Sequence, residues 1–153
     1  AGVDFGGGDP TAVVPLGVSA REHVHQFGEF YRRGPVTIDE IAGYLHRLHS
    51  VAPFHAILAD PSEPVAIATL RSMGLPVYAA DNARAEGLGY VAFLLDNDRL
   101  TIGSDCKNSI AEFAGYRWTE RVDPSSKDRY ATTTTTLRPS KFLQRLRQWL
   151  RCL

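Results

Sequence analysis

The segment 54–81 alternates short apolar runs with one helix-like stretch, and this pattern constrains the fold more than any other feature of the chain. Two runs, FHAILAD and LPVYAAD, have the length and flanking residues of buried strands. Between them, PSEPVAIATLRSMG is opened by Ser62 and Pro64 and stopped by Gly74, which predicts a helix. The alternation indicates a sheet with helices packed on it.

Extended segments precede this unit, and further helices and a strand follow it. Residues 2–6, 11–18 and 23–34 read as an antiparallel meander, the last with Val24, Phe27, Phe30 and Tyr31 available to the core. The other predicted elements are a strand at 99–103 and helices at 37–51, 82–97 and 104–118. The fold class is therefore α/β, with an antiparallel meander followed by strand–helix units and helices on both faces of a mixed sheet.

Two of these helices carry specific sequence signals. Thr37 and Glu40 have the spacing of a capping box, and Ile38, Ile41, Leu45 and Leu48 fall on one face of the helix that follows. In the helix at 104–118, Ser104 and Asp105 form the N-cap, and the residues expected on one apolar side are Ile110, Phe113, Ala114 and Trp118.

Length and composition are those of one globular domain with a distinct tail. The chain has 153 residues, 44% hydrophobic and 22% charged, with no net charge. We expect a core at 1–118, a low-complexity loop at 119–137 containing five consecutive threonines, and a basic amphipathic helix at 138–153. No apolar run approaches the ~20 residues that span a membrane, and no leader segment is recognisable.

Acidic residues at strand ends are the candidate functional groups. Asp4 interrupts an apolar strand and Asp60 ends another, so their carboxylates converge if these strands are neighbours. Hard divalent cations such as Mg²⁺ or Mn²⁺ prefer such oxygen ligands, and paired ions of this kind act in phosphodiester hydrolysis. The glycines after Asp4 would let a substrate backbone approach. The alternative is that each acid, including Asp9 before Pro10, is a solvated turn residue.

Other chemistries have no matching motif. His46 and His49 lack an acidic or cysteine companion, and Cys106 and Cys152 form no metal-binding or disulfide pattern. No serine or cysteine has the context of an activated nucleophile, and no P-loop motif is present.

The order of motifs resembles a known family. GVDFGGGDPTAVV, FGEFYRRGPVTIDEIAGYL, ILADPSEP and CKNSIAEFAGYRW, spread over residues 2–118, are similar to the C-terminal nuclease domain of the large terminase subunit of tailed phages. The resemblance implies an RNase H-like fold and cleavage of double-stranded DNA during genome packaging, with Mg²⁺ or Mn²⁺, two ions in the paired arrangement, held by acids. It also implies an ATPase motor domain, portal and small terminase subunit as partners in the host cytoplasm, and no membrane.

The same resemblance assigns residues. Asp4 matches the first-strand acid, Asp60 matches the acid of the ADP stretch, and Asp9 lies where some members carry an extra acid. The family's third metal-binding acid has no clear match, and Asp128 is the nearest substitute, with Asp123 next. The basic residues expected to contact the DNA backbone without sequence specificity are Arg84, Lys107, Arg117 and Arg121.

Two alternatives remain open at this point. The incomplete acid set is also typical of a weakened or inactive RNase H-like domain that binds DNA or protein. The DFGGGD stretch would also suit the phosphate-binding turn of a sugar-kinase or actin-like ATPase, although the chain is short for that fold.

Overall fold

The computed structural model describes residues 1–6, 9–80, 84–114, 118–121 and 134–137, with 84–89, 118–121 and 134–137 described as backbone. The main sheet has the strand order β5-β2-β1-β6-β7. Its strands are β1 (Gly2–Asp4), β2 (Thr11–Val14), β5 (Phe30–Arg32), β6 (Ile57–Ala59) and β7 (Val77–Ala79). β2 is antiparallel to β1 and to β5, whereas β6 is parallel to β1 and to β7, which makes the sheet mixed as predicted.

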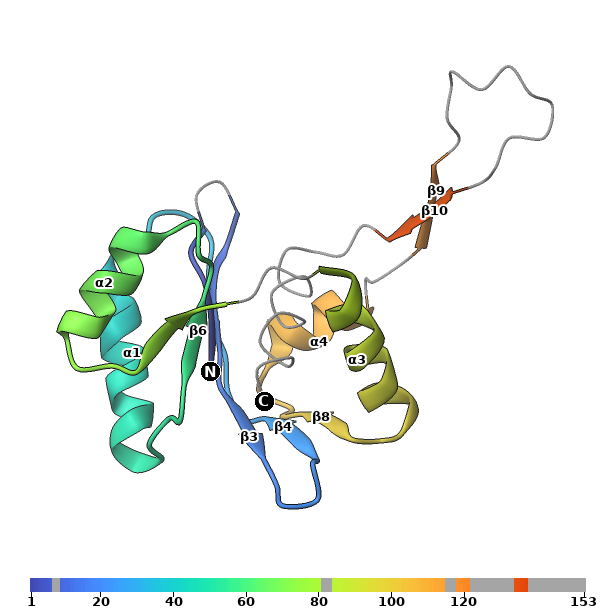
Figure 1. Cartoon of the computed structure of the whole chain (residues 1–153), viewed down its shortest axis with the longest axis horizontal. Coiled ribbons are helices and arrows are strands. Elements are labelled where there is room, and N and C mark those ends of the chain that lie inside the picture. The colour runs from blue at the N-terminus through green and yellow to red at the C-terminus, as the bar shows by residue number, and fades with distance from the viewer. Residues whose placement is uncertain (7–8, 81–83, 115–117, 122–133, 138–153) are drawn as a thin grey trace.

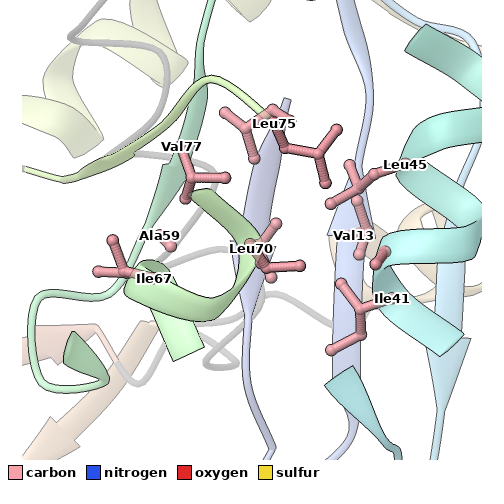
Figure 2. Close-up of a cluster of buried hydrophobic side chains, with 11 residues drawn as sticks. Val13, Ile41, Leu45, Ala59, Ile67, Leu70, Leu75 and Val77 are labelled. Carbon is pink, nitrogen blue, oxygen red and sulfur yellow. The ribbon is translucent and has the colours of Figure 1, made fainter. Parts of the chain in front are cut away.

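Helices cover both faces of this sheet (Figure 1). On one face lie α1 (Ile38–Val51) and α2 (Pro64–Ser72), and on the other lie α3 (Arg84–Asp96) and α4 (Lys107–Ala114). Figure 2 shows the core beneath α1 and α2, where Ile41 and Leu45 pack with Val13 and Leu70, all at most 2% exposed. The predicted fold class, with helices on both faces, is confirmed.

A second, three-stranded sheet has the order β3-β4-β8. Its strands are β3 (Leu16–Val18), β4 (Val24–Gln26) and β8 (Leu100–Ile102). β2 passes into β3 at Pro15, which has no backbone N–H to continue the ladder, so the segment predicted as one extended piece divides between two sheets.

The predicted strand at 23–34 also divides, into β4 in the small sheet and β5 in the main sheet. The break falls at residues 27–29. Phe27, expected in the core, is 43% exposed, whereas Val24 is buried as expected. The apolar residues of this stretch, Val24, Phe27 and Phe30, are three apart and do not alternate strictly, so a single continuous strand does not place all of them on one face.

The helix predicted at 104–118 is shorter than expected. α4 ends at Ala114, and Trp118 begins β9 (Trp118–Arg121). Phe113 packs against the core, but Ile110 is 42% exposed, and the buried residue of this helix is Ser109. The predicted apolar side is therefore confirmed for Phe113 and wrong for Ile110, and the polar contacts of the buried Ser109 are described below.

The segment predicted as a loop contains part of a two-stranded ribbon. β9 pairs antiparallel with β10 (Thr134–Leu137), and the threonine tract supplies most of β10. Consecutive β-branched residues favour extended backbone, which accounts for this pairing. The proposed terminal helix at 138–153 lies outside the described residues.

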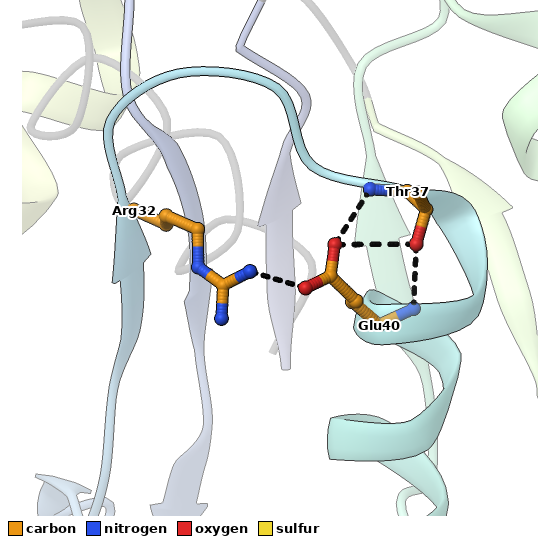
Figure 3. A network of polar contacts seen from close by, with 3 residues as sticks. All are labelled: Arg32, Thr37 and Glu40. Atoms are coloured by element: carbon orange, nitrogen blue, oxygen red, sulfur yellow. Dashed lines mark hydrogen bonds and ion pairs between the residues drawn. The ribbon is translucent and has the colours of Figure 1, made fainter.

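The predicted capping box is present at the start of α1. The Thr37 hydroxyl accepts from the Glu40 N–H, and the Glu40 carboxylate accepts from the Thr37 N–H (Figure 3). The start of α2 differs slightly from expectation, since Glu63 is the N-cap residue and Pro64 the first helical residue, while Ser62 lies before them.

Replacing Thr37 by alanine is expected to lower the free energy of unfolding by about 1 kcal/mol, because one N–H of the first turn loses its acceptor. Urea denaturation measures this. Ser50→Ala is the control, since that hydroxyl only donates to the Arg47 carbonyl at the other end of the helix. Equal stability losses in the two variants would contradict the capping role.

Candidate metal centre

Asp4 and Asp60 lie side by side at one edge of the main sheet. Asp4 ends β1, and Asp60 directly follows β6, the parallel neighbour of β1. The register pairs Val3 with Ala59, so the next step along both strands brings Asp4 opposite Asp60. Adjacent strands are about 4.8 Å apart, so the two residues are neighbours across the sheet.

The side chains of both acids belong to the face covered by α3 and α4. Val3 and Ala59 pack in the cluster under α1 and α2. Because side chains alternate along a strand, the residues that follow them face the other way. Ala12, opposite Asp4 on β2, packs in the cluster on that second face. The sheet register therefore places the backbones of Asp4 and Asp60 side by side, as the predicted convergence of their carboxylates requires.

Both carboxylates are nearly buried, with Asp4 6% and Asp60 7% exposed. One oxygen of Asp60, Oδ1, accepts a hydrogen bond of 2.8 Å from the backbone N–H of Ser62, which orients the carboxyl group. Ionised carboxylates at such burial require compensation of their charge. Carboxylate oxygens are the ligands that hard divalent cations prefer, so this donor set is of a kind that fits Mg²⁺ or Mn²⁺.

Asp9 lies in the turn that follows β1 and is exposed. Gly6, in the same turn, donates its N–H to the Thr11 hydroxyl over 3.0 Å. A Cβ at Gly6 would lie 2.0 Å from the Asp9 carbonyl oxygen, so glycine is required by the turn itself. This requirement is separate from the role expected for that glycine, which was to make room for substrate and stays a prediction; the next two glycines lie outside the described residues.

The structure describes the other predicted site residues only in part. Lys107 is exposed and is the first residue of α4. Arg84 begins α3 and Arg121 ends β9, both as backbone. Asp128 and Arg117 lie outside the described residues. Within the described part of the chain, no three His, Cys, Asp or Glu side chains are grouped closely enough to hold a metal ion.

Glu29, an acid that the sequence analysis did not identify as functional, connects the segment between β4 and β5 to the start of α4. Glu29 receives four hydrogen bonds of 2.8–2.9 Å from the backbone and side chains of Asn108 and Ser109, at the start of α4. Although burial works in the other direction, these bonds hold the pKa of Glu29 below its usual value. Ser109 is fully buried and also accepts from Gln26 Nε2 over 2.7 Å. No local pattern predicts these contacts, because the residues they join are far apart in the chain.

Structural similarity places the fold among solved proteins. The chain is similar to the large terminase of a thermophilic bacteriophage, with a TM-score of 0.76 and 22% identity over 99% of this chain. It spans 38% of the length of that terminase. It is also similar to the nuclease domain of the large terminase of bacteriophage SPP1, solved with bound Mn (TM-score 0.69, 21% identity, 99% of this chain and 85% of that one).

The nuclease of the large terminase from thermophilic phage G20c is a further match, with a TM-score of 0.62 and 15% identity over 95% of this chain and 77% of that one. No protein-family model matches the chain, and no curated protein matches it in sequence. The fold is therefore that of an RNase H-like α/β nuclease domain. More particularly, it is the fold of the nuclease domain of phage large terminases, as the sequence resemblance implied.

Proposed function

We propose that this chain is a divalent-metal-dependent endonuclease that cleaves double-stranded DNA with low sequence specificity. The observation that carries the proposal is the placement of Asp4 beside Asp60, nearly buried and on one face, at the carboxyl edge of parallel strands. The fold supports it, because a nuclease domain with this fold was solved with bound Mn.

In this proposal Asp4 and Asp60 hold Mg²⁺ or Mn²⁺, two ions in the paired arrangement. Bound there, the ions supply an activated water and stabilise the oxygen that leaves the phosphodiester. The protein's contribution is to fix the two carboxylates: the strand register sets their spacing, and the Ser62 N–H holds one oxygen of Asp60. Asp9 and Asp128 are the proposed additional ligands.

The basic residues proposed to hold the DNA backbone are Arg84, Lys107, Arg117 and Arg121. Contacts of arginine and lysine with phosphates carry no sequence information, which accounts for low specificity. Lys107 suits the role, since it is exposed at the start of a helix on the face of the acids.

The biological setting is proposed from the same similarity. Since the chain spans 38% of the thermophilic phage terminase, we propose that it acts with an ATPase motor domain, and with portal and small terminase subunit, in genome packaging in the host cytoplasm. The structural neighbours include that large terminase in complex with ATP-gamma-S, which is consistent with a motor in the complete protein. None of the helices in the described part of this chain is long and apolar enough to cross a membrane.

Plasmid nicking tests the proposed activity. Supercoiled DNA incubated with the chain and Mn²⁺ or Mg²⁺ should convert to open-circular and linear forms, and EDTA should stop the reaction. Fragments without a common end would agree with low specificity. No conversion with either ion at high protein concentration would contradict the enzyme and favour a non-catalytic interaction domain.

A further inference from the structure

Two consecutive arginines, Arg32 at the end of β5 and Arg33 after it, differ in their ion pairing. The Arg32 guanidinium forms an ion pair with Glu40 at the start of α1 (Figure 3) and lies 5.4 Å from the centre of the Phe30 ring. Its charge is therefore compensated. Arg33 is exposed, and it makes no ion pair with any residue that the structure describes. Among the described residues, Arg32 is therefore ion-paired and Arg33 is not.

Arg33 lies at the same edge of the sheet as the two acids. β5 is antiparallel to β2, and β2 is antiparallel to β1, so β5 runs in the direction of β1 and β6. The carboxyl ends of all three strands therefore meet at one edge. Asp4 ends β1, Asp60 follows β6, and Arg33 follows β5.

The register also sets the distance between Arg33 and the acids. Tyr31 is paired with Ala12, and Ala12 with Asp4, so these three residues form one row across the sheet. Two strand spacings separate Tyr31 from Asp4 by about 10 Å, and Arg33 lies two residues, about 7 Å, further toward the edge. The Arg33 backbone is therefore about 12 Å from that of Asp4, at the same edge of the sheet.

Tyr31 links Arg33 to the face that carries the acids. Its hydroxyl donates to Glu112 Oε1 of α4 over 3.3 Å, and α4 lies on that face. Burial and the charge of Glu112 raise the pKa of Tyr31, whereas the nearby Arg33 guanidinium acts to lower it. Side chains alternate along an extended chain, so Arg33 shares the side of Tyr31, opposite to Arg32, which pairs with Glu40 of α1.

We propose that Arg33 binds a backbone phosphate of the DNA strand that is cut at Asp4 and Asp60, and that Tyr31 is a positioning residue for it. A guanidinium with no ion-pair partner in the described structure is suited to a phosphate, which it binds through two parallel hydrogen bonds. The contact is independent of sequence. This inference rests on the proposed function, because it requires that the substrate is DNA.

Binding of a fluorescein-labelled duplex of about 30 base pairs to the full 153-residue chain, in EDTA to prevent cleavage, tests the inference across a salt series. At the lowest salt, Arg33→Gln should raise the Kd about tenfold and reduce the slope of log K against log salt by about 1. Arg32→Gln removes the same charge from a compensated site and should leave the Kd within about twofold.

The positioning role of Tyr31 is tested by a double-mutant cycle. Tyr31→Phe should raise the Kd in the same direction by less, and adding it to Arg33→Gln should cause no further loss, because its effect passes through Arg33. Additive losses would show that Tyr31 acts independently of Arg33 and would overturn its role. Thermal melting of each variant checks that the fold is retained.

Equal effects of Arg33→Gln and Arg32→Gln, or no DNA binding by the wild-type chain, would overturn the role of Arg33. Failure of the proposed nuclease activity can be distinguished from failure of the proposed Arg33 contact. If Arg33→Gln weakens DNA binding but the chain never nicks plasmid, the proposed phosphate contact of Arg33 is supported and the proposed nuclease activity is contradicted. If the chain nicks plasmid but the two arginine variants have equal KM values, only the role of Arg33 fails.

Discussion

Replacing Asp4 or Asp60 by asparagine is expected to reduce the rate of metal-dependent DNA cleavage by roughly 100- to 1,000-fold, the loss typical of removing one preorganised group that stabilises the transition state. Asparagine keeps the size of the side chain but removes its negative charge, so it weakens the hold on a divalent cation. The rate is measured as the initial conversion of supercoiled plasmid at one fixed Mn²⁺ concentration, just sufficient for full activity of the wild type.

Asp98→Asn is the matched control for these two variants. Asp98 is exposed in the turn between α3 and β8, and its positive φ of 52° is a backbone conformation that asparagine accepts readily. Its cleavage rate should equal that of the wild type. Full activity in Asp4→Asn or Asp60→Asn would show that cleavage does not depend on the acid pair, whereas equal losses in all three would indicate a general effect of lost charge.

Glu29→Ala is expected to lower the free energy of unfolding by about 2–3 kcal/mol, because a charged acceptor of four hydrogen bonds is lost. The buried Ser109 hydroxyl then has no acceptor for its proton, which adds a desolvation cost. Urea denaturation at neutral pH measures the change. The Glu63→Ala control should have little effect, since Glu63 holds the N-cap position of α2 without a side-chain hydrogen bond.

The stabilisation by Glu29 should also depend on pH. The folded-state pKa of Glu29 is lower than its usual value. The contribution is therefore fully present above the usual glutamate pKa and is lost as the pH falls through the lower, folded-state pKa. The stability difference between wild type and Glu29→Ala should shrink over that acidic range. A difference that stays constant through it would contradict a role for the ionised carboxylate.

The sequence predicts the parts of this fold that depend on local signals. The Thr37–Glu40 capping box needs only residues three apart, and the strands that end at Asp4 and Asp60 are visible as apolar runs closed by an acid. That these two strands are neighbours is a condition that the sequence leaves open and that the parallel pairing of β1 with β6 supplies. The fold class and the two candidate acids could therefore be predicted without coordinates, whereas their adjacency could not.

Features that depend on register or on distant contacts could not be predicted in this way. The row from Tyr31 through Ala12 to Asp4 exists only once the pairing of three strands is known. The orientation of α4 follows from hydrogen bonds between Ser109, Gln26 and Glu29, which override an apolar pattern that favoured burial of Ile110. In both cases the determining contact joins residues that are not local in the sequence.

The central claim is that Asp4 and Asp60 together hold a divalent cation. A crystal of the chain soaked in Mn²⁺, measured for anomalous scattering, tests it most directly. We expect an Mn²⁺ peak within coordination distance of both carboxylates in the wild type and its loss in Asp60→Asn crystals. An Mn²⁺-soaked crystal without a peak at these carboxylates, or with the same peak in both proteins, would contradict the claim.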